Sequence, residues 1–219
     1  MKFFRYLLAF LTILIFILAI YFGFFKTKNK EHTILSPIAE VTTQKTSNFS
    51  LEKAPTESLK GKIVTMTGEI SWQSRTATEA ARIFSPSEIQ QGEKLITGEK
   101  SNLALVFTEA CSVTLSEKTE MEIVQTLPAN IVFSQTNGTG EYVKTGGYPV
   151  TIRVMNLLAE EDGDMIVSID PKKPIISLTL RSGKATAAFN DLNYVSHEMT
   201  VVAGQTFIFN YDTRKGVLK

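Results

Sequence analysis

The stretch "GEKLITGEKS", residues 92–101, decides whether the chain is interpreted as a nucleotide-binding enzyme or as a β domain. Its glycines are followed by Lys100 and Ser101, as in a phosphate-binding loop. That loop has the order G-x-x-x-x-G-K-[ST], because consecutive backbone N–H groups must surround the phosphates. Lys94 and Glu99 occupy the two glycine positions, and the carboxylate of Glu99 would repel a bound anion. The stretch therefore argues against a nucleotide site.

The same stretch predicts β structure instead. Gly92 and Gly98 bracket a short strand, Lys94–Thr97, and we expect both glycines to lie in turns. The following "NLALVF", residues 102–107, has no helix start signal and is typical of a strand. Residues 100–101 are then expected to face solvent.

The chain from residue 61 onward repeats short apolar runs separated by turn signals. In one run, residues 150–154, apolar and polar side chains alternate as in a strand with one buried face. Candidate strands cover 62–70, 103–107, 112–115, 120–124, 131–134, 150–155, 165–169, 175–180, 185–189, 199–202 and 206–210. Turn signals between strands are Asn137-Gly138, Gly146-Gly147, Asp162-Gly163, Asp170-Pro171 and Ser182-Gly183. Many short strands at this spacing predict an all-β fold, either a sandwich or a coiled β-helix-like domain.

One segment departs from the β pattern. Thr76 and Glu79 form a capping-box pair ahead of Ile83 and Phe84. This pattern predicts a short helix over residues 76–84.

A weak internal echo links the two halves of the β region. "TGEISW", residues 67–72, and "SGKATA", residues 182–187, each begin with a turn glycine that leads into a strand. A second glycine follows each of them, 24 and 21 residues later. The echo predicts two related β layers within one domain. The expected turn glycines are Gly68, Gly92, Gly98, Gly183 and Gly204.

The amino-terminal segment is strongly apolar. Residues 6–25, "YLLAFLTILIFILAIYFGFF", have Thr12 as their only clearly polar side chain. As a helix they would span the ~30 Å hydrocarbon core of a bilayer. A cleaved signal peptide usually has an apolar run of only ~7–15 residues and a small-x-small cleavage site, which this segment does not match. We predict an uncleaved transmembrane anchor that follows a short cytoplasmic tail, residues 1–5.

Between the anchor and the β region, residues 26–60 are rich in Lys, Thr, Ser and Glu and contain Pro37 and Pro55. This composition predicts a flexible tether. Residues 61–219 then form a single β domain. Lysine and arginine are almost equally frequent on the two sides of the anchor, so charge alone leaves the membrane orientation open.

Charge and cysteine content exclude several classes of protein. Residues 31–219 carry 18 Lys and Arg against 22 Asp and Glu, a net charge of 18 − 22 = −4. No basic stripe with interleaved aromatic residues is present, so nucleic acid is not an expected partner. Cys111 is the only cysteine, which excludes an intrachain disulfide.

The spacing of glycines and strands resembles the FecR-like domain family of bacterial envelope proteins. The pattern of that family is best matched over residues 62–125, and "VVAGQTF", residues 201–207, looks like its closing glycine turn. The matching positions are Gly68, Ile70, Ile89, Gly92, Glu93, Leu95, Thr97, Gly98, Ser101, Leu103, Leu105, Val113, Leu115, Thr119 and Met121. The usual D-G-S turn is replaced by residues 109–111, Glu-Ala-Cys, so we expect a different turn type there.

The resemblance implies an all-β domain outside the cytoplasmic membrane that binds or relays signals and is not an enzyme. Members that restrain sigma factors carry a cytoplasmic segment before the membrane helix. Residues 1–5 are too few to hold a partner domain, so the anti-sigma role is not expected. The expected protein is a single-pass membrane protein with an exported domain. Its expected partner is another envelope protein or a wall polymer, and no cofactor is implied.

Few residues suggest catalysis or metal binding. His32 and His197 have no partner at metal or triad spacing and are expected to be surface histidines. Cys111 could be a nucleophile of an envelope hydrolase or transpeptidase, but no activating base lies nearby in the sequence, so a semi-buried structural thiol is favoured.

Two further patterns have both a structural and a functional interpretation. "EEDGD", residues 160–164, does not follow the calcium-loop spacing and is expected to be an acidic, solvated turn, with calcium binding left open. The aromatic residues could form a glycan-stacking face, although packing is the simpler explanation. They are Trp72, Tyr142, Tyr148, Tyr194 and Tyr211. The remaining alternative is a structural subunit of an envelope machine.

Overall fold

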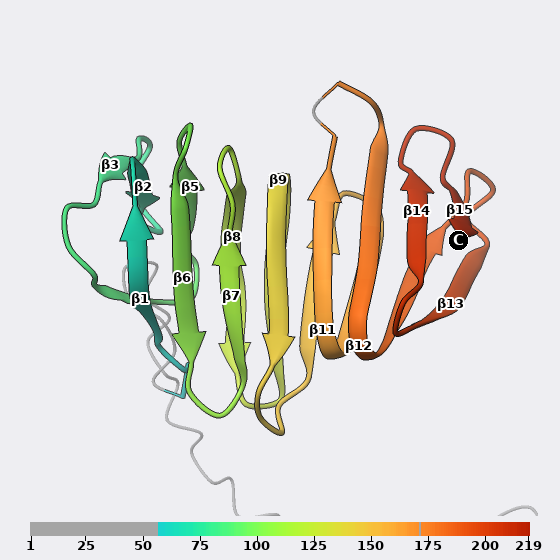
Figure 1. Ribbon diagram of the computed structural model, residues 1–219, viewed down its shortest axis with the longest axis horizontal. Helices are drawn as coiled ribbons and strands as arrows, with labels where there is room; N and C mark the ends of the chain where they lie inside the picture. Colours follow the sequence, from blue (N-terminus) through green and yellow to red (C-terminus); the bar gives the residue numbers. More distant parts are fainter. Residues whose placement is uncertain (1–56, 171) are drawn as a thin grey trace, which may run out of the picture. The chain divides into compact units, whose positions relative to one another are not determined.

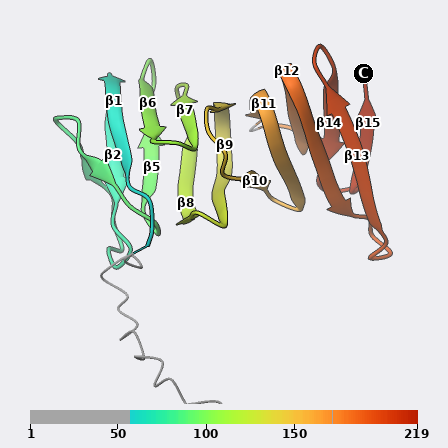
Figure 2. The same ribbon diagram turned by 90° about the horizontal axis from the view of Figure 1, so that it is seen from below.

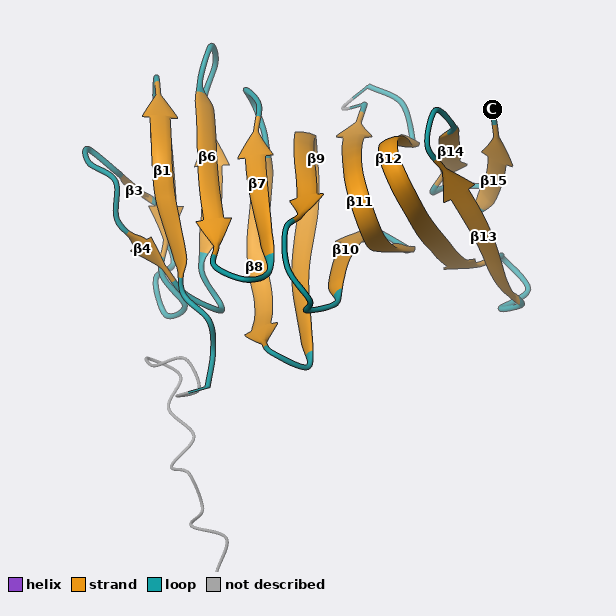
Figure 3. Ribbon diagram, turned by 60° about the horizontal axis from the view of Figure 1, so that its bottom comes forward, coloured by secondary structure: helices purple, strands orange, loops and turns teal. Residues whose placement is uncertain are grey.

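The computed structural model of the chain describes residues 57–170 and 172–219. These residues form fifteen strands and no helix (Figure 3). The strands are β1 (Gly61–Thr67), β2 (Ile70–Gln73), β3 (Ala81–Arg82), β4 (Glu88–Ile89), β5 (Lys94–Thr97), β6 (Asn102–Phe107), β7 (Cys111–Leu115), β8 (Glu120–Leu127), β9 (Asn130–Lys144), β10 (Val150–Val154), β11 (Leu157–Ile169), β12 (Ile175–Asn190), β13 (Ser196–Val202), β14 (Thr206–Asn210) and β15 (Lys215–Leu218).

All fifteen strands belong to one open sheet that folds over itself into two layers (Figures 1 and 2). The first layer contains β1, β4, β6, β7, β14 and β15, and the second contains β2, β3, β5, β8, β10 and β13. The three longest strands, β9, β11 and β12, contribute one half to each layer. The first half of β9, for example, pairs with β8 and β10, and its second half pairs with β7 and β11. The prediction of an all-β fold is confirmed for the described residues, which form a single continuous sheet.

Glycine lies wherever a continuous extended segment passes from one layer to the other. Gly68 separates β1 from β2, Gly138 lies in β9, Gly163 in β11 and Gly183 in β12. Gly163 and Gly183 face each other where β11 and β12 bend together. A β-carbon on Gly183 would lie only 2.0 Å from the carbonyl oxygen of Asp162, and one on Gly163 only 2.1 Å from that of Ser182. The two backbones can therefore approach this closely only because neither residue has a side chain.

Three of the predicted turns are corrected by this arrangement. The pairs Asn137-Gly138, Asp162-Gly163 and Ser182-Gly183 lie inside long strands rather than between short ones. Glycine allows a sharp bend as well as a reversal, so each signal marks a crossing between layers.

The hydrophobic core lies between the two layers. Buried and exposed side chains alternate along the strands, as in β6 and β7, where every second residue is buried. Aromatic rings from opposite layers meet: the ring centroids of Phe107 and Phe133 are 5.3 Å apart, and those of Phe189 and Phe209 are 4.9 Å apart. Each fully buried side chain of this size contributes about 1.5–3 kcal/mol to folding, so these contacts hold the folded-over sheet together.

Buried hydroxyl groups connect the strands of the opening stretch. The Thr97 hydroxyl accepts a hydrogen bond from the Thr119 backbone N–H at 2.9 Å and donates to the Ser116 carbonyl. The Ser101 hydroxyl accepts from the Glu69 N–H at 2.8 Å and donates to the Glu99 carbonyl at 3.0 Å. The expectation that Ser101 faces solvent is therefore wrong, because its hydroxyl satisfies backbone groups of the turn.

Local predictions around these residues have mixed outcomes. β5 and β6 lie where the sequence pattern placed them. The predicted helix over residues 76–84 is wrong: the segment contains a turn, a bend and the strand β3, and the Ile83 N–H donates to the Ile70 carbonyl. Pairing with β2 has prevailed over the local capping signal. In the Glu-Ala-Cys turn, Glu109 takes the left-handed conformation with φ of 61°.

The amino-terminal predictions fall mostly outside the described residues. The expected tail, the anchor at 6–25 and residues 26–56 of the tether are among the residues that the structure does not describe. Within residues 57–170 and 172–219, no helix is both long and apolar enough to cross a membrane. The end of the expected tether is joined to the sheet, since the Leu59 N–H donates to the Thr126 carbonyl at 2.8 Å.

Substitution at two glycines will separate backbone strain from crowding. Gly183 and Gly204 have nearly equal φ angles, +76° and +84°, but only Gly183 faces another backbone within 4 Å. We expect Gly204→Ala to lower the free energy of unfolding by about 1 kcal/mol, the cost of the left-handed conformation. Gly183→Ala should lower it by more than about 3 kcal/mol, because the layer crossing must also open. Urea unfolding of the two variants measures the difference, and equal losses would contradict the crowding of β11 and β12.

Candidate functional site

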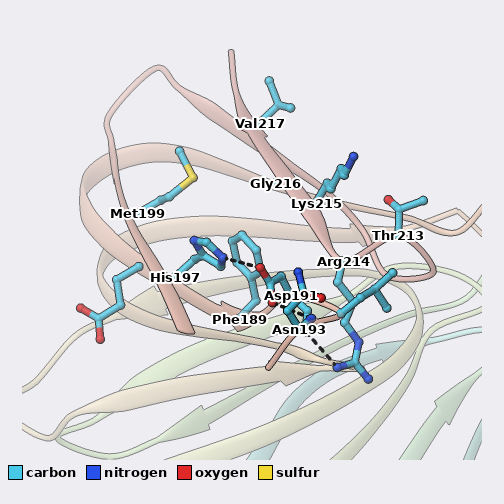
Figure 4. A pocket seen from close by; sticks show the side chains of 12 residues that line it. Phe189, Asp191, Asn193, His197, Met199, Thr213, Arg214, Lys215, Gly216 and Val217 are labelled. Atoms are coloured by element: carbon cyan, nitrogen blue, oxygen red, sulfur yellow. Dashed lines mark hydrogen bonds and ion pairs between the residues drawn. The ribbon is translucent and has the colours of Figure 1, made fainter. Parts of the chain in front are cut away.

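An apolar groove opens at the end of the sheet where both layers terminate. It has a volume of about 630 Å³ and lies between β13 in the second layer and β15 in the first (Figure 4). Phe189, His197 and Met199 come from β12 and β13, and Gly216 and Val217 face them from β15. The loops after β12 and after β14 close the two sides. We call this cavity the C-terminal groove.

A paired histidine and aspartate organise one wall of the C-terminal groove. His197 Nε2 lies 3.1 Å from Asp191 Oδ2, and its ring stacks on Phe189 with centroids 5.2 Å apart. The other Asp191 oxygen accepts the backbone N–H groups of Val195 and Asn193 at 3.0 and 2.8 Å. The Val195 N–H and the His197 ring hold the pKa of Asp191 below its usual value. Asp191 therefore fixes the loop that frames the groove.

The rim of the C-terminal groove exposes apolar side chains. Leu192 and Tyr194 in the β12–β13 loop are 62% and 80% exposed, and Val217 in β15 is 56% exposed. Val195 lies beside them and is also exposed. Single exposed apolar residues are common, but a cluster of them around a cavity is typical of an interaction site.

The groove combines an apolar lining with one polar pair, His197 and Asp191. The His197–Asp191 pair is the arrangement that would activate a nucleophile, but neither cysteine nor serine is among the residues that line the groove. Within residues 57–170 and 172–219, no group of three His, Cys, Asp or Glu side chains could hold a metal ion. His197 is a surface histidine, as expected, with a side chain that is 44% exposed. It lies in β13, where its ring stacks on Phe189 at the end of the core.

A second, polar cavity of about 260 Å³ lies at the bend of β11, where Lys144, Glu161, Asp162 and Lys184 line it. The Glu161 side chain is buried and neither of its oxygens has a hydrogen-bond partner. Burial raises the pKa of this carboxyl to about 8, so it is protonated at neutral pH.

The acidic stretch 160–164 is therefore not the solvated turn expected from its composition. It lies in the strand β11 and points alternately into the core and outward. Lys144 Nζ forms an ion pair with Asp162 at 3.2 Å, and Arg181 lies 3.9 Å from Asp164. The described residues offer no metal-binding group there.

Cys111 is buried at the start of β7. Burial, and then the nearby Glu161, raise the pKa of its thiol to about 12. A nucleophilic cysteine needs a lowered pKa and access to substrate, whereas burial and a raised pKa are typical of a structural thiol. The neighbouring Tyr142 is also fully buried, and its hydroxyl donates to the Gln135 side chain at 2.9 Å.

The aromatic residues that could have formed a stacking face do not share one surface. Tyr142 is buried, and Trp72, Tyr148 and Tyr211 pack against the core from different elements. Only Tyr194 is largely exposed, in the β12–β13 loop. His32 lies outside the described residues.

The expected turn glycines occupy different positions in the two layers. Gly68 and Gly183 lie at layer crossings, and Gly92 and Gly204 lie in the turns before β5 and β14. All four have positive φ. Gly98 follows β5 and donates its N–H to the Glu69 carbonyl at 2.8 Å, while the left-handed position of that turn is taken by Lys100.

Comparison with known proteins gives a partial structural likeness. No family model matches the chain, and no curated protein matches it. Two crystal structures of an anti-sigma factor candidate from Parabacteroides distasonis ATCC 8503, at 2.50 and 1.65 Å resolution, are similar to it. Each is 13% identical and has a TM-score of 0.49, with 57% of this chain and 58% of that chain covered. The chain thus spans less than two thirds of those structures, and the likeness concerns the arrangement of strands alone.

The buried carboxyl of Glu161 predicts a distinct pH dependence of stability. Its folded-state pKa of about 8 lies above the ordinary 4.5, so the unfolded chain releases this proton at lower pH than the folded chain. The contribution of the Glu161 carboxyl to the free energy of unfolding is therefore greatest below pH ~4.5. It falls by about 1.4 kcal/mol per pH unit up to pH ~8 and then levels off.

Glu161→Gln should remove this slope and stabilise the protein at pH 8, as measured by urea unfolding between pH 5 and 9. Glu160→Gln is the matched control, because Glu160 is the exposed neighbour on the same strand. Equal slopes in the wild type and in Glu161→Gln would show that the carboxyl is hydrated in solution.

Proposed function

We propose that the chain is a membrane-anchored, extracytoplasmic FecR-like protein whose β domain is a non-catalytic binding module for envelope sensing or signalling. Residues 6–25 would provide the anchor, and another envelope protein would be the partner. The C-terminal groove is the observation that carries this proposal. It is apolar, open, and framed by a loop that Asp191 holds in place.

Two further features support a binding role over catalysis. The thiol of Cys111 is buried and has a raised pKa, which weakens the alternative of a hydrolase or transpeptidase that uses this residue. The spacing of Gly92, Leu95 and Thr97 underlies the resemblance to the FecR-like family, and these residues serve the turn and the core of the domain. The family resemblance itself comes from the sequence pattern.

A site-specific photo-crosslinker in the full chain, expressed in membranes of its host, tests the proposal. We expect a crosslinker in place of Leu192 or Val217, on the rim of the C-terminal groove, to capture a protein of the envelope. The same group in place of Lys62, an exposed residue of β1, serves as the control and should capture much less. Mass spectrometry of the adducts identifies the partner.

The outcomes separate the proposal from its alternatives. Equal capture at the rim and at Lys62 would contradict a binding site in the groove. A partner captured at fixed stoichiometry under all conditions would favour a structural subunit of an envelope machine, whereas a signal-dependent partner supports sensing. A reporter fused after Lys219 that proved cytoplasmic would overturn the extracytoplasmic placement.

Replacement of Cys111 provides an independent test of the non-catalytic assignment. Cys111→Ser should leave the envelope phenotype of the host unchanged, because the buried thiol takes part in packing only. Stability should fall by about 1–3 kcal/mol, since a hydroxyl would be buried without an assured partner. Loss of phenotype in a variant that remains folded and present at wild-type levels would instead indicate a catalytic thiol.

A further inference from the structure

The strand β13 leaves most of one edge open beside the C-terminal groove, up to Val202, whose backbone groups are bonded to Gln205. Within residues 57–170 and 172–219, β13 pairs with β12 and with no other strand. It is seven residues long, "SHEMTVV", and contains no proline, lysine or bulge. Proteins usually protect an edge strand with such features, because its unpaired N–H and C=O groups invite another strand.

The hydrogen-bond pattern of the hairpin shows which groups are free. The Asp191 N–H donates to the Val195 carbonyl at 3.0 Å, and the Ala203 N–H donates to the Gly183 carbonyl at 3.2 Å. Bonded and non-bonded pairs alternate between these two ends of an antiparallel ladder. His197, Met199 and Val201 are therefore bonded to β12. The backbone groups of Glu198 and Thr200 point away from it, toward the open edge.

The side chains next to this edge determine which kind of strand could pair with it. His197 and Met199 face the C-terminal groove, so residues opposite them in an added strand would place apolar side chains into it. Glu198 is exposed on the outer face, and no cation pairs with it in the part of the chain that the structure describes. A lysine or arginine opposite Glu198 would complement its charge.

A second copy of the chain fits this edge less well than a different strand. If β13 paired with itself antiparallel about Met199, Glu198 would lie opposite Thr200 and would still have no cationic partner. A register that placed the two Glu198 residues opposite each other would bring like charges together, which is destabilising. Charge complementarity thus favours a partner of another sequence.

We propose that β13 takes an extended segment of a partner protein as an additional antiparallel strand. The segment carries apolar side chains at alternate positions, which enter the C-terminal groove, and a basic residue opposite Glu198. Main-chain hydrogen bonds to Glu198 and Thr200 supply affinity, and the groove and the carboxylate supply specificity. This inference rests on the proposed binding function and names the class of ligand for the same site.

A defined peptide tests the inference on the full chain in detergent micelles. The probe is the capped heptapeptide Thr-Leu-Thr-Leu-Lys-Leu-Thr. Paired antiparallel, it places its lysine opposite Glu198 and its leucines toward the groove. We expect saturable binding by fluorescence anisotropy, and slower hydrogen exchange at the backbone N–H groups of Glu198 and Thr200. The same peptide with proline at its third position, opposite Thr200, cannot donate its backbone hydrogen bond to the Thr200 carbonyl and should bind at least about tenfold more weakly.

Two variants of the chain probe the edge and the charge separately. Thr200→Pro removes an outward N–H that takes no part in the ladder with β12, so the fold should persist while peptide affinity falls at least about tenfold. Glu198→Lys should weaken the lysine peptide and strengthen a peptide with glutamate in place of lysine. Glu79→Lys, at an exposed residue between β2 and β3, is the matched charge control and should change neither affinity.

Several results would overturn strand addition at β13. One is unchanged affinity in a folded Thr200→Pro variant, and another is the absence of a reciprocal charge effect at Glu198. Self-association of the chain that Thr200→Pro abolishes would assign the edge to a second copy. If no peptide binds but crosslinks from Leu192 persist in membranes, strand addition fails while the binding function stands. If those crosslinks are absent as well, both proposals fail.

Discussion

The structure depends on the ability of single strands to cross between two layers. β9, β11 and β12 each bend in mid-course, and β1 continues into β2 across a similar bend. At the bend of β11 and β12 the two backbones approach so closely that a single β-carbon would collide with a carbonyl oxygen. Because these bends turn the apolar faces of the two halves toward each other, one open sheet encloses a core that a flat sheet would leave in water.

The same constraint creates both unusual sites. At the bend of β11, the alternation of the strand directs Glu161 into the interior beside Cys111, while Asp162 and Lys144 pair at the surface. At the far end, β13 and β15 terminate different layers, so the core ends between them as an open groove. A sheet closed on itself would have no free edge.

Much of the fold could be predicted from the sequence, because alternation of apolar and polar residues directly reflects a half-buried strand. Lys94–Thr97 and Asn102–Phe107 show this clearly. The glycine pairs Asn137-Gly138 and Ser182-Gly183 were misleading, because glycine permits both a reversal and a bend and only tertiary contacts decide between them. The helix predicted from the capping pair Thr76 and Glu79 was wrong for a similar reason. A short helix is only marginally stable, and backbone pairing with β2 is more favourable.

The candidate site was less accessible to prediction. Phe189, Met199 and Gly216 come from three strands. No local sequence pattern predicts that these strands meet around one groove. The burial of Ser101 and Glu161 was not predicted, because both residues lie among polar neighbours in the sequence. The direction of a side chain in a strand is set by alternation and not by the polarity of its neighbours. A seven-residue strand without proline or lysine, residues 196–202, was the one signal in the sequence that could have indicated an open edge.

The lone buried cysteine has a consequence for how the domain is made. A thiol with a pKa of about 12 that is enclosed by the core is protected from oxidants and from other thiols once folding is complete. Before that point the same thiol is an unpaired reactive group on an open chain. If the domain folds in an oxidising compartment, the yield of folded protein therefore depends on two competing rates. One is the rate at which the two layers close, and the other is the rate at which an external disulfide or oxidant reacts with Cys111.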